Sequence, residues 1–113
     1  MDITQTTIDD KTCLIKLDGT LNAASADSVK ETLRQVVADG KRQIVLDLAE
    51  VPFIDSSGLT ALVSGKRMLN AEEGSLKLAS LQSQAKLLFN LTMFDQIFEL
   101  YDTPDLALKT FAS

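Results

Sequence analysis

The 113 residues suffice for one domain with one hydrophobic core, spanning residues 1–113, and are too few for two ordinary domains. The net charge of −5 argues against sequence-independent nucleic-acid binding, which requires clustered basic side chains. Because the N-terminus lacks a secretory signal and no apolar run is long enough to cross a bilayer, we expect a cytoplasmic protein without membrane insertion.

The first elements expected along the chain are two strands joined by a tight turn. Residues 2–8 and 11–19 are rich in β-branched residues, and Asp9-Asp10-Lys11 between them is typical of a hairpin turn. In the second run apolar and polar residues largely alternate, which indicates a half-buried strand. The single cysteine, Cys13, lies in this strand and has no partner for an internal disulfide, so we expect a buried thiol in a reducing compartment.

An amphipathic helix and a central strand follow. Apolar residues recur at spacings of three and four up to Gly40, which is a typical helix stop, and either Asn22 or Ser25 is available as the N-cap. Residues 43–48 are an almost continuous apolar run of strand length, as expected of a strand covered on both faces.

The second half of the chain continues this alternation. A helix is expected from about Ser56 to Gly74, and Gly65 inside it indicates either a closely packed neighbour or simple tolerance. The elements expected after it are a strand at 75–80, a helix at 83–91 packed through Leu87, Leu88 and Leu91, a short strand at 97–102, and a terminal helix from Thr103 to near Phe111. This order predicts an α/β fold, with a mixed, mostly parallel sheet, an antiparallel first strand and surrounding helices.

The most distinctive motif is Asp55-Ser56-Ser57-Gly58, at a strand-to-helix junction. A serine hydrolase triad needs an imidazole to accept the serine proton, and the chain has no histidine. Lys66 lies ten residues along the same predicted helix, about 15 Å away, which is too far for a Ser-Lys arrangement. The Gly-x-Ser-x-Gly elbow is also absent.

Other catalytic and ligand-binding interpretations fit no better. Six residues separate Gly58 from Gly65, whereas a P-loop has four, and Arg67 replaces the metal-binding hydroxyl. Asp9-Asp10 leads directly into a second strand, which is the wrong topology for a phosphorylatable-aspartate receiver. Without histidine or paired cysteines the sequence gives little support for a metal site, and we predict no cofactor.

Two interpretations of the hydroxyls remain. Asp55 or Ser56 could cap the helix by accepting its free N–H groups. The same position could be a phosphorylation site, because the amides and the dipole at a helix N-terminus favour negative charge.

The residues of this region resemble a known family. The stretch IVLDLAEVPFIDSSGL is similar to the signature of STAS domains, and specifically of bacterial anti-sigma factor antagonists. The similarity extends to LDGTLNAASADSVKETL and to AKLLFNLTMFDQIFELYDTPDLAL. The resemblance implies a non-enzymatic regulator that binds an anti-sigma factor serine kinase when unphosphorylated. Phosphorylation by that kinase releases the antagonist, and a metal-dependent serine phosphatase reverses the modification.

The resemblance also assigns roles to individual residues. It implies that Ser56 is the phosphate acceptor, that Ser57 and Gly58 shape the turn, that Asp55 precedes the acceptor and that Leu59 lies close to the docking surface. Two positions depart from the common pattern of the family: Asn22 replaces an acidic residue, and Thr60 replaces a second glycine. We expect both to belong to the partner-binding surface and to influence the choice of partner.

An alternative within the family is a STAS interaction module in another signalling complex or a transporter-associated assembly. The sequence also leaves a dimer open, because several predicted helices expose apolar residues.

Overall fold

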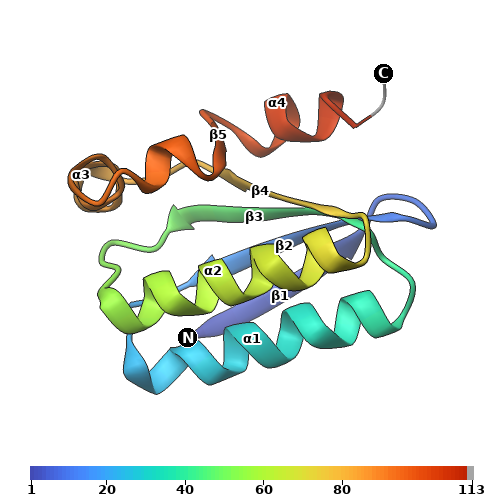
Figure 1. The fold of residues 1–113 in the computed structure, drawn as a ribbon, viewed down its shortest axis with the longest axis horizontal. Helices are drawn as coiled ribbons and strands as arrows, with labels where there is room; N and C mark the ends of the chain where they lie inside the picture. The colour runs from blue at the N-terminus through green and yellow to red at the C-terminus, as the bar shows by residue number, and fades with distance from the viewer. Residues whose placement is uncertain (112–113) are drawn as a thin grey trace.

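The computed structural model describes residues 1–111 of the chain. The elements within this range alternate much as the sequence predicts (Figure 1): β1 (Asp2–Thr7), β2 (Thr12–Asp18), α1 (Ala23–Ala38), β3 (Gln43–Glu50), α2 (Ser56–Ala71), β4 (Ser75–Ala79), α3 (Ser83–Leu91), the 3₁₀ turn η1 (Phe94–Gln96), β5 (Glu99–Tyr101) and α4 (Pro104–Lys109).

The strands form one five-stranded sheet in the order β1-β2-β3-β4-β5. β1 pairs with β2 in the antiparallel sense, and the other neighbours pair in parallel. The hairpin turn forms where it was expected, because the Asp9 Oδ1 atom accepts hydrogen bonds from the N–H groups of Lys11 at 2.9 Å and Thr12 at 2.8 Å. The mixed, mostly parallel α/β sheet predicted from the sequence is therefore confirmed.

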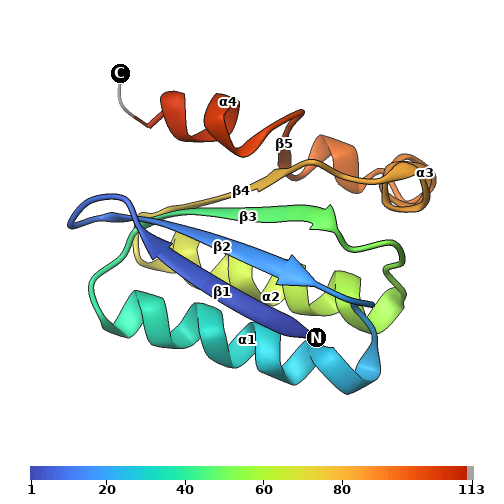
Figure 2. The ribbon, with the colours of Figure 1, turned by 180° about the vertical axis from the view of Figure 1, so that it is seen from behind.

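The two faces of the sheet are covered differently (Figures 1 and 2). Helices α1 and α2 lie side by side on one face, and α4 lies on the other. Beneath α4 a small second cluster contains Val45, Ala79 and Ala107. The Lys77 ammonium is buried at this contact, 3.2 Å from the Glu99 carboxylate and 4.2 Å from the centroid of the Phe111 ring.

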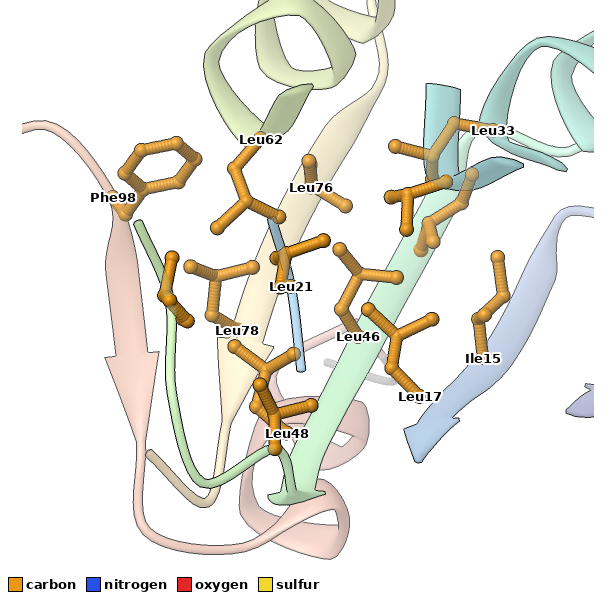
Figure 3. Packing of buried hydrophobic residues seen from close by; sticks show 14 of the residues in the cluster. Ile15, Leu17, Leu21, Leu33, Leu46, Leu48, Leu62, Leu76, Leu78 and Phe98 are labelled. Carbon is orange, nitrogen blue, oxygen red and sulfur yellow. The ribbon is translucent and has the colours of Figure 1, made fainter. Parts of the chain in front are cut away.

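The main core lies between the sheet and the pair α1 and α2, and it is largely aliphatic (Figure 3). The inward residues of β2 and β3 meet Leu33 of α1 and Leu62 of α2 there. Cys13 is buried, as expected. A Cβ atom on Gly65 would lie only 2.5 Å from Leu33 Cδ1, so the glycine in α2 allows close packing of α1.

Two expectations about the C-terminal third were wrong in detail. Helix α3 forms and Leu88 is partly buried against the core, but Ala85 and Phe89 are its buried residues, and Leu87 and Leu91 are 60% and 73% exposed. The reason is that Phe89 joins Phe94 and Phe98 in an aromatic cluster, which orients this face of the helix inward. The last strand is also shorter than expected, since η1 precedes it and pairing begins at Glu99.

Candidate functional site at the start of helix α2

The Asp55–Gly58 turn lies at the carboxyl edge of the parallel strands. The chain leaves β3 at Glu50 and reaches α2 through a segment that is paired with Leu21, which follows β2. The Leu21 N–H donates to the Phe53 carbonyl at 3.0 Å, and the Asp55 N–H donates to the Leu21 carbonyl at 3.1 Å. The two connections that follow β2 and β3 therefore support each other.

A side chain from α3 also fixes this segment. Gln84 Oε1 accepts a hydrogen bond from the Ile54 N–H, and Gln84 Nε2 donates to the Ile54 carbonyl, both at 2.9 Å. Both backbone polar groups of Ile54 are thereby satisfied one residue before the motif. Sequence analysis missed Gln84, because its contact is 30 residues away along the chain and has no local signature.

Asp55, and not Ser56, caps helix α2. Its backbone is extended and its Oδ1 atom accepts a hydrogen bond from the Gly58 N–H at 3.0 Å. Ser56 is then the first residue of the helix and is exposed. Within residues 1–111, neither the Ser56 hydroxyl nor the N–H groups of Ser56 and Ser57 have a hydrogen-bond partner. This end of α2 therefore presents a free hydroxyl beside free amide donors.

Gly58 is required by close packing. A Cβ atom at this position would lie 2.5 Å from the Leu21 carbonyl oxygen and 2.7 Å from Leu21 Cγ. The same carbonyl accepts the hydrogen bond from Asp55, so a side chain at Gly58 would push against the contact that holds the turn.

Asn22 caps α1 at the same edge of the sheet. Its Oδ1 atom accepts a hydrogen bond from the Ala24 N–H at 3.0 Å, and its own N–H donates to Ser25 Oγ at 3.0 Å, which completes a capping box. Of the two candidate caps, the structure therefore selects Asn22, with Ser25 as its reciprocal partner. Asn22 is next to Leu21 in the chain and is thus held close to the Asp55 turn.

Leu59 and Thr60 at the start of the helix differ in burial. Leu59 is only 6% exposed and belongs to the main core, whereas Thr60 is exposed and donates from Oγ1 to the Ser56 carbonyl at 2.9 Å. Ser57 is half-buried and, together with Thr60, lines a shallow hollow of about 240 Å³ toward α1. The predicted site residues are therefore gathered at one end of the α1 and α2 layer.

A second hollow, of about 370 Å³, extends from Ser56 along α2; we call it the α2 groove. Its lining residues are Ser56, Leu59, Thr60, Val63, Arg67 and Phe94. Sequence analysis missed Val63, Arg67 and Phe94 as site residues. The spacing of Ser56, Val63 and Arg67 on one helical face could have indicated the first two, but Phe94 comes from η1 and gives no local signal.

Residues 1–111 contain no group of three metal-ligating side chains close enough to share an ion. In the same range no helix combines the length and the apolar character needed to span a bilayer.

The comparison with known sequences supports the resemblance noted above. A family model described as the STAS domain matches residues 4–107. The Bordetella bronchiseptica protein named anti-sigma factor antagonist BtrV is 30% identical over 95 residues, which cover 84% of this chain and 82% of that protein. An anti-sigma-B factor antagonist of Staphylococcus aureus is 30% identical over 88 residues, covering 78% of this chain and 82% of the relative.

Solved structures share the fold. A Thermotoga maritima protein described as an anti-sigma factor antagonist superimposes with a TM-score of 0.91 at 24% identity, covering 98% of this chain and 95% of that one. A sulfate transporter family protein of Wolinella succinogenes superimposes with a TM-score of 0.80 at 20% identity, over 93% of this chain and 88% of that one. At these identities the likeness concerns the fold alone.

Proposed function

The chain belongs to the STAS domain family, and we propose that it is an anti-sigma factor antagonist whose binding is switched by phosphorylation of Ser56. The unphosphorylated form binds an anti-sigma factor that is also a serine kinase. Phosphorylation of Ser56 by that kinase releases the antagonist, and a metal-dependent serine phosphatase restores it. The observation that carries the proposal is the exposed Ser56 hydroxyl, which has no hydrogen-bond partner within residues 1–111.

The local geometry supports a phosphate that leaves the fold intact. Ser56 is the first residue of α2, where free N–H groups and the helix dipole favour negative charge. The Gly58 N–H donates to the Asp55 side chain and not to Ser56. A phosphate on the Ser56 hydroxyl therefore need not break the cap. The phosphorylated chain should therefore remain folded.

The same phosphate can abolish docking. It adds a charge of about −1.5 to −2 at the mouth of the α2 groove. An unpaired or repelled charge in a desolvated interface costs about 2–5 kcal/mol, which is about 30- to 4,000-fold in affinity. A switch therefore needs no conformational change in the antagonist.

The other residues of the site have supporting roles in this proposal. Asp55 and Gly58 hold the turn in place, so they act on the position of Ser56 rather than on the partner directly. Ser57 and Thr60 present hydroxyls beside the acceptor, and Leu59 forms the apolar floor. Asn22 extends the contact surface at the start of α1 and contributes to the choice of partner.

The test is to incubate the protein with the anti-sigma factor kinase encoded in the same genome and ATP. One phosphate should appear at Ser56, and the complex should dissociate. Ser56→Ala should stay bound under the same conditions, and Ser57→Ala, the matched control, should still be phosphorylated. Equal affinity of the phosphorylated and unmodified proteins for the kinase would contradict the proposal.

A second candidate is a STAS module that docks in a transporter-associated or other signalling assembly. The observation behind this alternative is that a sulfate transporter family protein of Wolinella succinogenes shares the fold. Identification of a transporter subunit as the bound protein, together with no binding to the anti-sigma factor kinase, would select it.

A further inference from the structure

We propose that the α2 groove receives an acidic, amphipathic segment of the partner, which places an apolar side chain between Leu59, Val63 and Phe94 and a carboxylate against Arg67. This inference rests on the proposed function, because it describes the partner that the Ser56 surface binds. It adds a second contact point, at the far end of the groove from the phosphate acceptor.

The groove has two polar ends and an apolar middle. Ser56 and Thr60 supply hydroxyls at the start of α2, while Arg67 lies eleven residues after Ser56, on the same helical face and about 16 Å further along the axis. Val63 and Leu59 lie between these ends, and Phe94 of η1 forms the facing wall. An apolar side chain of the partner fits this middle section.

Of the three arginines in the chain, Arg67 is the one without a carboxylate partner within residues 1–111. The chain has a net charge of −5, and Arg34 and Arg42 are paired with Glu31 and Glu72. Within residues 1–111, neither Arg67 nor its neighbour Lys66 has such a partner. The Lys66 ammonium lies 5.8 Å from the centroid of the Phe98 ring, so a second cation is held next to the groove wall.

These features select a carboxylate on the partner. The planar guanidinium of arginine matches a carboxylate through two parallel hydrogen bonds, and Arg67 is exposed and available for them. Two adjacent cations on an acidic protein are too few for the phosphate backbone of a nucleic acid. A partner segment that carries a carboxylate, and an apolar residue one or two helical turns from that carboxylate, complements both the Arg67 charge and the apolar middle of the groove.

The segment that supplies Phe94 is itself poorly covered. Leu87, Leu91, Met93 and Ile97 are all exposed along α3 and η1. Met93, directly before Phe94, has a positive φ of 61°, a backbone conformation that a side chain of this type rarely adopts. Exposed apolar side chains therefore flank Phe94 in the chain, and a partner segment longer than a single side chain could contact them.

Arg67 acts independently of the phosphate on Ser56. An arginine side chain cannot span the distance of about 16 Å along α2, so it neither neutralises nor holds that phosphate. Ser56 and Arg67 lie more than about 10 Å apart and would contact different residues of the partner, so the effects of changes at the two sites are expected to add. Loss of the Arg67 charge should therefore weaken the complex without altering the switch.

The test measures the Kd of the full chain for the anti-sigma factor kinase of the same genome by calorimetry at two salt concentrations. Arg67→Glu should raise Kd about tenfold at low salt, and Arg67→Met should raise it less and reduce the salt dependence. Lys109→Glu, on α4 at the other face of the sheet, is the control for charge reversal and should bind like the wild type. Far-UV circular dichroism checks that each variant is folded.

The outcomes separate this inference from the proposed function. If phosphorylation of Ser56 abolishes binding but Arg67→Glu binds like the wild type, the acidic-segment inference is overturned and the switch stands. If phosphorylation of Ser56 leaves Kd unchanged, the proposed switch is refuted, and the Arg67 variants still show whether the partner occupies the groove. A chain that does not bind the kinase at all refutes both.

Two further outcomes identify the occupant. Replacement of one acidic residue of the kinase by lysine should restore the affinity of Arg67→Glu, and failure of every such replacement would refute the ion pair. Sedimentation of the chain alone tests a second copy as occupant, because a dimer dissociated by Arg67→Glu would overturn the assignment to a partner.

Discussion

The two glycines of helix α2 provide a sharp test of how the candidate site is held. Both Gly58 and Gly65 lie within the helix, where alanine is more favourable than glycine by about 1 kcal/mol. A Cβ atom at either position would meet a neighbouring atom at 2.5 Å. The identity of that atom separates the two cases.

At Gly58 the obstacle is the Leu21 carbonyl oxygen, with Leu21 Cγ at 2.7 Å and Ile54 Cγ2 at 3.0 Å. The carbonyl cannot move without breaking its 3.1 Å hydrogen bond from Asp55. At Gly65 the obstacle is Leu33 Cδ1, the end of a side chain that can change rotamer. Overpacking a core costs about 1–3 kcal/mol. After subtraction of the gain of about 1 kcal/mol in helix propensity, we expect Gly58→Ala to lower the free energy of unfolding by about 2 kcal/mol and Gly65→Ala to leave it nearly unchanged.

These values correspond to measurable shifts in Tm. An unfolding entropy of about 2.1 cal/mol/K per residue makes each kcal/mol worth about 4 °C for a chain of this length, so Tm should fall by about 8 °C for Gly58→Ala and hardly change for Gly65→Ala. Circular dichroism at 222 nm is the suitable probe, because the chain has no tryptophan and one tyrosine. Urea unfolding provides an independent value.

A Gly58→Ala protein as stable as the wild type would refute the reasoning, as would a larger loss for Gly65→Ala. Either result would mean that the connections after β2 and β3 are not rigidly held together, and that the position of Ser56 is less constrained than the distances indicate.

Three further predictions concern groups with defined partners. Asp55→Ala should lower the free energy of unfolding by about 1 kcal/mol through loss of the cap to Gly58, whereas Asp55→Asn should retain most of it; equal losses in urea titrations would argue against the cap. Hydrogen bonds from the N–H groups of Lys11 and Thr12 hold the pKa of Asp9 below its usual 3.8, so ionised Asp9 stabilises the fold above that pH, and this contribution is lost as the pH falls through the lower folded-state pKa. Asp9→Asn should therefore flatten the pH dependence of the urea midpoint in acid, and an unchanged profile would contradict it. Burial raises the pKa of the Cys13 thiol, so a disulfide reagent should label it at pH 8 only after urea unfolds the chain; rapid labelling of the native protein would contradict its burial.

Much of the fold follows from local patterns along the chain. The alternation in β2, the caps at Asn22 and Asp55 and the turn at Asp9 all depend on residues within a few positions of one another. Hydrogen bonds and side-chain periodicity at that range are set by backbone geometry, so they can be predicted without knowing what packs against them. The same locality placed Ser56 at the start of a helix.

Local patterns could not predict which elements of the chain pack against one another, or through which face. The leucines of the segment 83–91 lie on one apolar helical face and predicted packing through that face. Helix α3 instead buries Phe89, because two other phenylalanines lie beside it in the folded chain. A helix with apolar residues on more than one face can pack by either, and only the neighbouring elements decide between them.

The sequence by itself determined the order of the elements and the position of Ser56 at the start of a helix, because both depend on short-range chemistry, and the mixed sheet was predicted from that order. Tertiary structure alone decided that Gln84 clamps Ile54, that Gly58 must accommodate the Leu21 carbonyl, and that Arg67 and Phe94 complete a groove with Ser56. These contacts join residues distant in the chain, where side-chain packing selects the neighbour and local pattern carries no information about it.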